Sequence, residues 1–252
     1  MKTIELSMNV ENDYEELSQA VANQVIQTVK QNPEAWICIA GGDTPVRAME
    51  IIVEASAKQE LSFSKCSFVE LDEWKGLGKN DEGSCYYILN NHLFSPLGLR
   101  TDQIHVFNAV APSLTEECGQ MIKVLEKAGG LDLIVLGIGR NGHLGFNEPG
   151  SNFNSSIRVV ELDNTTTEVG EKYFNNSKVV PPSRGITLGV KQILEADKAI
   201  LMASGSKKAE IVKQFWAGPI SRSTPASVLK LHKNCMVFLD EEASEYLNEL
   251  EI

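Results

Sequence analysis

The sequence lacks any excess of positive charge. Its 252 residues carry 23 lysines and arginines against 34 aspartates and glutamates, which gives a formal net charge of -11. Nucleic acids and anionic membrane surfaces are bound through basic patches, so neither is expected as a partner. An anionic small molecule would need a local group of cations inside this repelling field.

The sequence also lacks a long apolar run and a cysteine framework. No stretch approaches the ~20 apolar residues that span a bilayer, and the N-terminal stretch "MKTIELSMNVENDYEE" has no apolar signal region. The cysteines number five, an odd count, without any C-x-x-C pair, and Cys38 and Cys66 lie in strand-like runs typical of buried small hydrophobes. We therefore expect a reducing compartment, and hence a cytoplasmic protein.

Short apolar runs alternate with amphipathic stretches along the chain. Strands are predicted at residues 35–40, 66–71, 104–107, 131–138, 199–204 and 235–239. Helices are predicted at residues 13–31, 45–59, 114–128, 190–196 and 207–216, the first with Asp13 as its N-cap. Because no linker is visible, the pattern predicts one domain over residues 1–252. Its expected class is α/β, a doubly wound, mainly parallel, Rossmann-like sheet with helices on both faces.

The loop "GIGRNGHLGFNEPG", residues 137–150, directly follows the predicted strand "LDLIVL". In this architecture, ligands bind beyond the carboxyl ends of the strands, so His143 is a candidate acid or base. An imidazole needs an orienting partner, and Asn141 and Glu148 could supply one. A satisfied core histidine is the alternative. Zinc is discounted because no H-x-x-x-H pair and no nearby cysteine accompanies His143.

Two other loops also follow predicted strands. In "AGGDTP", Gly41 and Gly42 permit close backbone approach, and Thr44 lies before a helix whose free N–H groups favour phosphate. A plain strand-to-helix turn is the alternative, and Asp43 would repel a phosphate. In "LDEW", Asp72 is either a proton carrier tuned by burial or part of a solvated turn.

Cations recur near the C-terminal third of the chain. Arg184 in "PPSRGITLG" is predicted to precede a helix, and Lys207 and Lys208 in "SGSKKAE" are predicted to begin one. A lysine at a helix N-terminus is disfavoured by the helix macrodipole. Either an anion bound there or solvation of the lysines would explain their position.

Taken together, "GGDTP", "LDEW", "GIGRNGHLGFNEPG", "RGITLG", "GSKKA" and "PASVLKLH" occur in one order across about residues 37–240. With these motifs the chain resembles the glucosamine-6-phosphate deaminase family, which shares its NagB-type fold with 6-phosphogluconolactonases. "LDEW", "GRNGHLGFNEPG" and "RGITLGVKQIL" most resemble the galactosamine-6-phosphate deaminase/isomerase branch.

The resemblance implies a role for each matching residue. Asp72 would move a proton between sugar carbons 2 and 1, His143 would open the ring, and Glu148 and Asn141 would orient His143. Most glucosamine enzymes carry an aspartate at position 141, so Asn141 is a departure from the pattern. The residues implied in phosphate binding are Gly41, Gly42, Thr44, Lys208, Lys172 (where deaminases carry an arginine) and Arg184, which shares or replaces the role of position 172.

The resemblance further implies a small amino sugar phosphate as substrate and no metal or organic cofactor, because a carbon acid beside an imine or carbonyl needs only a placed base. The expected reaction is galactosamine 6-phosphate plus water to tagatose 6-phosphate plus ammonia. Glucosamine-6-phosphate deaminase, 6-phosphogluconolactonase and a non-catalytic sugar phosphate sensor are the alternatives. The sequence leaves the oligomeric state open, with a homo-oligomer as one option.

Overall fold

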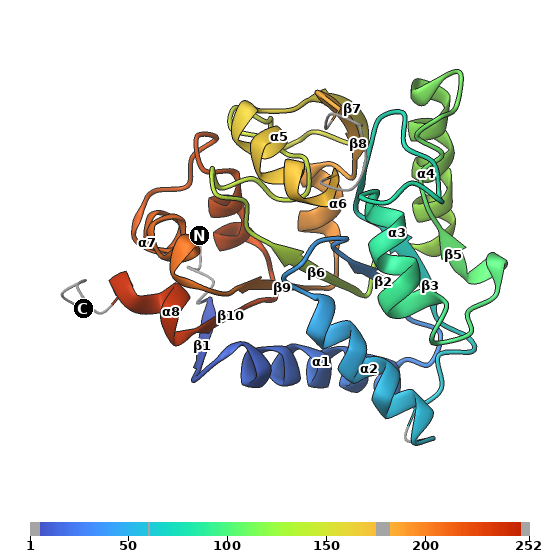
Figure 1. Cartoon of the computed structure of the whole chain (residues 1–252), viewed down its shortest axis with the longest axis horizontal. Coiled ribbons are helices and arrows are strands. Elements are labelled where there is room, and N and C mark those ends of the chain that lie inside the picture. The colour runs from blue at the N-terminus through green and yellow to red at the C-terminus, as the bar shows by residue number, and fades with distance from the viewer. Residues whose placement is uncertain (1–5, 60, 175–181, 248–252) are drawn as a thin grey trace.

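The computed structural model describes residues 6–59, 61–174 and 182–247, and it has the α/β architecture that the sequence predicts (Figure 1). The predicted domain range 1–252 therefore includes ends, 1–5 and 248–252, that lie outside the described residues, as does Pro181 of "PPSRGITLG". A seven-stranded parallel sheet has the order β1-β10-β9-β6-β2-β3-β5. Its strands are β1 (Ser7–Glu11), β2 (Trp36–Ile39), β3 (Ser67–Glu70), β5 (Ile104–His105), β6 (Leu133–Gly137), β9 (Lys198–Ala203) and β10 (Cys235–Asp240).

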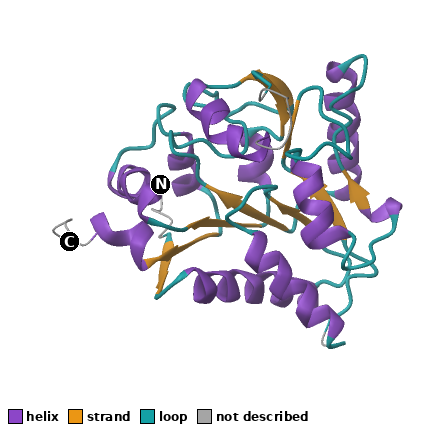
Figure 2. Ribbon diagram, viewed as in Figure 1, coloured by secondary structure: helices purple, strands orange, loops and turns teal. Residues whose placement is uncertain are grey.

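Helices cover both faces of this sheet (Figure 2). On one face lie α1 (Tyr14–Gln31), α2 (Val46–Ala57) and the helical turn η1 (Asn90–Phe94), which continues α3 (Cys85–Leu89). On the other lie α4 (Leu114–Ala128), α6 (Val190–Glu195), α7 (Ala209–Ala217), η5 (Pro225–Leu231) and α8 (Glu241–Ser244). The predicted helices are confirmed within two residues at each end. In α1, the Asp13 side chain accepts a hydrogen bond from the Glu16 N–H at 2.9 Å, as expected of an N-cap.

The central strands are apolar throughout because both of their faces are covered. In β2, Ile37 and Ile39 face the α1–α2 layer, while Cys38 faces the opposite layer. The neighbouring strand β6 alternates in the same way and is buried along most of its length. This two-sided burial explains why the sequence predicts these strands well. All five cysteines are free and buried, as expected for Cys38 and Cys66.

A second, three-stranded antiparallel sheet was not predicted. It consists of β4 (Asp72–Trp74), β8 (Arg184–Thr187) and β7 (Arg158–Glu161), in the order β4-β8-β7. Asp72 is paired with Thr187 in this sheet. Between β7 and β8, the chain forms α5 (Asn164–Gly170) and the turn η3 (Glu171–Phe174), and Figure 1 shows α5 on the same side of the molecule as the small sheet.

The strand order creates a switch point in the large sheet. After β2 the chain runs to β3 and β5 on one side, and after β6 it runs to β9 and β10 on the other side. The loops after β2 and β6 therefore diverge and leave a crevice at the carboxyl ends of two adjacent strands. In the described part of the chain, no helix is long and apolar enough to cross a membrane.

Candidate active site

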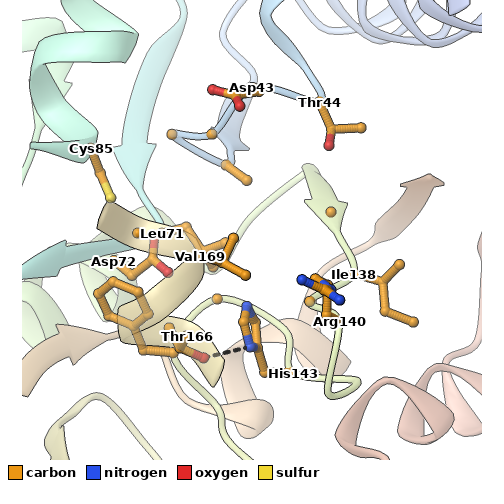
Figure 3. Close-up of a pocket in the computed structure, with 18 of the residues that line it drawn as sticks. Asp43, Thr44, Leu71, Asp72, Cys85, Ile138, Arg140, His143, Thr166 and Val169 are labelled. Carbon is orange, nitrogen blue, oxygen red and sulfur yellow. Dashed lines mark hydrogen bonds between the residues drawn. The ribbon is translucent and has the colours of Figure 1, made fainter. Parts of the chain in front are cut away.

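A cavity of about 200 Å³ lies at this switch point (Figure 3). The loops after β2 and β6 form two of its walls, and β4 and the α5–η3 segment form the others. The structure brings seven of the ten predicted site residues to its lining, namely Gly41, Gly42, Thr44, Asp72, His143, Lys172 and Lys208. Two more, Asn141 and Glu148, contact His143, and Arg184 is discussed below.

The glycine-rich loop after β6 folds tightly around His143. The Gly139 N–H donates to the His143 carbonyl at 3.0 Å, and the Gly142 N–H donates to the Gly139 carbonyl at 2.9 Å. A Cβ atom on residue 139 would lie 2.2 Å from Cε1 of the His143 ring, so only glycine leaves room for the ring there. Gly142 has a φ of +85°, a left-handed conformation that favours glycine. Gly139 is therefore required by the placement of the imidazole, and Gly142 by the turn beside it.

His143 is oriented through its Nδ1 atom. The Thr166 hydroxyl lies 3.1 Å from Nδ1, and Glu148 Oε2 lies 3.5 Å from it. Asn141 Nδ2 donates to Glu148 Oε2 at 2.8 Å, while Asn141 Oδ1 accepts the His143 backbone N–H. The opposite ring nitrogen, Nε2, has no hydrogen-bond partner among the described residues, so it is free for a ligand. An amide at position 141 thus orients the carboxylate that orients the imidazole.

Glu148 is held in its charged form. Burial alone would raise the pKa of this carboxyl, but hydrogen bonding and charge from His143, with hydrogen bonds from Thr166 and Asn141, lower the pKa below its ordinary value. A carboxylate beside Nδ1 favours the tautomer with a proton on Nδ1. Nε2 is then the nitrogen able to take up a proton.

Asp72 enters the same pocket from β4 and is 6% exposed. Burial, followed by the negative charge of Glu73, raises the pKa of its carboxyl to about 8, and Glu148 adds to the shift. A hydrogen bond from Cys85 acts in the opposite direction. Figure 3 shows Asp72 and His143 reaching the pocket from separate segments of the chain. A carboxyl that can hold or release a proton near neutral pH suits proton transfer.

Cations gather at another part of the lining. Lys208 donates from Nζ to the Ile138 carbonyl at 2.6 Å, and burial lowers its pKa to about 8, with further lowering by the nearby Lys172 and Arg140. Lys172 forms an ion pair with Asp43, which faces these cations. Three cations and one carboxylate therefore provide a local positive region in a negatively charged protein.

The loop after β2 has a structural reason for its first glycine. A Cβ on Gly41 would lie 2.7 Å from the Cys85 carbonyl oxygen, so this glycine permits close packing of the loop on α3. A Cβ on Gly42 would meet nothing nearer than the Tyr173 hydroxyl at 3.8 Å. The Asp43 N–H donates to the same hydroxyl at 3.3 Å, which ties the loop to the η3 turn.

Arg184 is not brought to this pocket. It begins strand β8, not a helix, and pairs with Glu161 of β7, to which its Nε donates at 2.8 Å. Its side chain is 45% exposed and does not contribute to the lining. The expectation that Arg184 joins the phosphate site is corrected by this antiparallel register, which turns the guanidinium toward a neighbouring carboxylate.

The lining residues that sequence reasoning missed include Arg140, Thr166 and Tyr173. Arg140 lies inside the loop 137–150 that the sequence analysis emphasised, so its charge could have indicated a role in phosphate binding. Thr166 and Tyr173 come from the α5–η3 segment, whose place over the pocket depends on the unpredicted small sheet.

Comparisons with known proteins show the family to which the chain belongs. Residues 11–238 match the family model described as glucosamine-6-phosphate isomerases/6-phosphogluconolactonase. The glucosamine-6-phosphate deaminase of Bacillus velezensis is 39% identical over 231 residues, covering 92% of this chain and 95% of that protein. The deaminase of the same name from Clostridium botulinum is 37% identical over 239 residues, covering 95% of this chain and 98% of the relative.

Solved structures give the same result. A structure described as a monomeric glucosamine-6-phosphate deaminase, a "missing link of the NagB superfamily", superposes with a TM-score of 0.92 at 34% identity, covering 95% of this chain and 99% of that one. The 6-phosphogluconolactonase of Trypanosoma brucei shares the fold, with a TM-score of 0.79 at 20% identity, covering 97% of this chain and 99% of the other. The chain belongs to the glucosamine-6-phosphate isomerase/6-phosphogluconolactonase family.

Proposed function

We propose that the protein is an amino sugar phosphate deaminase-isomerase that converts glucosamine 6-phosphate and water to fructose 6-phosphate and ammonia. The observation that carries this proposal is a buried Asp72 carboxyl in the same pocket as the oriented His143 ring. The relatives above bear the glucosamine name, which favours that sugar over galactosamine 6-phosphate, the first expectation from the sequence. Galactosamine 6-phosphate is the alternative substrate.

The phosphate group of the substrate would lie against the cations. Lys208 and Lys172, with Arg140, supply positive charge, and Thr44 and the backbone of Gly41 and Gly42 line the same cavity. A dianion bound there would compete with Asp43 for Lys172. Because the protein as a whole is negatively charged, this local site would have to supply nearly all of the attraction for the phosphate.

Ring opening is the step assigned to His143. It requires a proton to leave the hydroxyl on carbon 1 and a proton to reach the ring oxygen. An imidazole with its Nδ1 held by Glu148 and Thr166 can do both through Nε2. The product of this step is the open aldehyde with an amine on carbon 2.

Proton transfer between carbons is the step assigned to Asp72. The carboxylate removes the proton from carbon 2, and the resulting enolamine receives a proton on carbon 1. The nitrogen is then part of an imine, which adds water and releases ammonia to leave the ketone. A carboxyl whose pKa burial raises to about 8 can hold the proton between removal and delivery.

Lactone hydrolysis is the second candidate, since 6-phosphogluconolactonases share the fold. It would use the cations and His143, but it gives no role to a second acid/base group as deeply buried as Asp72. The identities of these lactonases are 20% or lower, whereas those of the deaminases above are 34% or higher.

An ammonia-release assay on glucosamine 6-phosphate and galactosamine 6-phosphate, side by side, tests the proposal, with hydrolysis of 6-phosphogluconolactone as a third arm. We expect ammonia from at least one amino sugar phosphate, with the higher kcat/KM for glucosamine 6-phosphate. Lactone hydrolysis without ammonia release would refute the deaminase proposal. A higher kcat/KM for galactosamine 6-phosphate would refute only the sugar.

The remaining parts of the proposal concern the whole protein. We infer a single domain over residues 1–252 and a cytoplasmic enzyme, in keeping with relatives of sugar phosphate metabolism. A homo-oligomer stays a prediction, and the similar deaminase structure is described as monomeric.

A further inference from the structure

Three carboxyl groups gather beside the pocket, where the chain passes from the large sheet to the small one. Glu70 ends β3, and Asp72 and Glu73 begin β4, with exposures of 0%, 6% and 2%. Within the described residues, none of the three forms an ion pair, and no group of three or more ligating side chains is arranged to hold a metal ion. Their negative charge must therefore be compensated by hydrogen bonds or removed by protonation.

Glu73 is compensated by backbone amides. Its Oε1 accepts the N–H of Trp74 at 2.7 Å and that of Cys85 at 3.0 Å, and its Oε2 accepts the N–H of Tyr86 at 2.9 Å. These bonds join β4 to the first residues of α3. Burial raises the pKa of Glu73 to about 6, and these three N–H bonds oppose that shift, so Glu73 is charged at neutral pH.

Glu70 is the group that is left without compensation. Its Oε2 accepts the Phe107 N–H at 2.8 Å, but its buried Oε1 has no donor among the described residues. Burial, and then the charge of Glu73, raises the pKa of Glu70 well above its ordinary value. Protonation of Glu70 would remove the charge that this unpartnered oxygen otherwise shares. The pair then carries a single negative charge, on Glu73.

Cys85 links Glu73 to the two functional walls of the pocket. Glu73 holds its backbone N–H, and its thiol lies beside the Asp72 carboxyl, whose pKa it lowers. Its carbonyl oxygen packs so closely on Gly41 that a Cβ there would lie at 2.7 Å. Fixing Cys85 therefore fixes the distance between Asp72 and the loop after β2.

Among the described residues, the charges that shift the pKa of Asp72 are those of carboxylates. The titratable groups that face Asp72 are Glu73 on its own strand, Glu70 of β3, Cys38 of β2, Cys85 of α3 and Glu148 of the loop after β6. Burial raises the pKa values of both thiols well above their ordinary range, so the thiols are neutral. The charges that act on Asp72 are thus negative, and that of Glu73 has the larger effect.

We propose that Glu73 is a positioning residue for the proton transfer: it fixes Cys85 and the start of α3 against Asp72, and its charge, retained because Glu70 is neutral, favours the protonated form of Asp72. This inference rests on the proposed deaminase function, in which Asp72 must hold a proton between two carbons. Glu73 itself does not line the pocket and contacts no reacting atom.

Glu73→Gln is the first test, since it keeps the size of the side chain and one acceptor oxygen but removes the charge. We expect the acidic limb of the kcat/KM profile to move to lower pH by about one unit or more, since a like charge is removed from beside Asp72. We expect kcat to fall about tenfold and KM to stay within about twofold, because the cations are untouched. Glu82→Gln, an exposed position near the start of α3, is the matched charge control.

Glu70→Gln tests which carboxyl holds the shared proton. Its amide is neutral and imitates a protonated carboxyl, so we expect the acidic limb to stay at the wild-type pH. An acidic limb that shifts as far in Glu70→Gln as in Glu73→Gln would overturn the assignment of the charge to Glu73. A limb that is unmoved in folded Glu73→Gln would overturn the proposal as a whole.

A titration of the wild-type protein tests the proposal without an enzyme assay. In carbon-13 NMR of aspartate-labelled protein, with Asp72→Asn for assignment, we expect Asp72 to titrate near pH 8 and to show a smaller inflection near pH 6, where Glu73 titrates. A single step near the ordinary aspartate value of about 3.9 would overturn the proposal, even if Glu73→Gln fails to fold. The expected titration without any ammonia release would support the arrangement and refute the proposed reaction.

Discussion

Gly139→Ala is expected to disable the pocket with little effect on the fold. The added Cβ would lie 2.2, 2.3 and 2.4 Å from three ring atoms of His143, whereas ordinary contacts begin near 3.4 Å. The ring must therefore retreat by about 1 Å or more, and a misplacement of that size costs on the order of 100-fold in rate. That loss corresponds to about 3 kcal/mol of transition-state stabilisation.

The size of the displacement makes the effect specific to His143. A shift of about 1 Å would disturb the contacts of the ring with Thr166 at 3.1 Å and Glu148 at 3.5 Å, which set its orientation. Arg140 follows position 139 in the same loop, but Lys208 and Lys172 belong to other segments, so most of the phosphate binding should persist. We therefore expect kcat to fall about 100-fold with KM nearly unchanged, which separates a misplaced catalytic group from a lost binding contact.

Steady-state ammonia release and thermal unfolding together measure this prediction. Gly119→Ala is the matched control, because Gly119 lies in α4, where an added Cβ meets no atom within 4 Å. The control should keep full activity and gain about 0.5–1 kcal/mol of stability, since alanine suits a helix interior better than glycine. A folded Gly139→Ala protein with at least half of the wild-type kcat would refute the reasoning.

Other changes separate binding from chemistry. Lys208→Ala should raise KM for the phosphorylated sugar by roughly tenfold or more, whereas Lys207→Ala at the exposed neighbour should not; equal effects would make Lys208 structural. Asp72→Asn should lower kcat about 100- to 10,000-fold while the phosphorylated ligand still binds, as calorimetry would measure, and a near wild-type kcat would exclude proton transfer by Asp72. Asp43→Asn should lower KM up to about fivefold by freeing Lys172 from an exposed ion pair, and this gain should vanish in a Lys172→Met background. A gain that persists in that background would mean that Asp43 acts by another route.

The large sheet was predictable because its strands are buried on both faces. Runs such as "LIVL" before Gly137 are apolar without interruption, and they end where glycine-rich loops begin. Since parallel strands bring their carboxyl ends to one edge, the sequence also predicted that His143, Asp72 and the Gly41 loop would meet. Two of the partners that orient His143, Asn141 and Glu148, were predicted from their residue types, but Thr166 was missed.

The small sheet was beyond prediction for an equally physical reason. Strands of three and four residues, as in "DEW" and "RVVE", carry too few positions for an alternating pattern to stand out. Arg184 was predicted to bind an anion because its actual partner, Glu161, lies on another strand. The register of β7 on β8 brings the two together, and the sequence does not reveal that register. The ion pair between Lys172 and Asp43 was likewise not predictable, because the two residues lie 129 positions apart in the chain.

The pairing of Asp72 with Thr187 also sets when this protein can become active during its synthesis. Asp72 is made in the first third of the chain, but its strand has no neighbour in the small sheet until β8 emerges, more than a hundred residues later. Lys208 follows later still. A nascent chain that ends before β8 carries the carboxylate without the surroundings that tune its pKa. Catalytic competence is therefore gained late in synthesis, after both β8 and Lys208 have emerged.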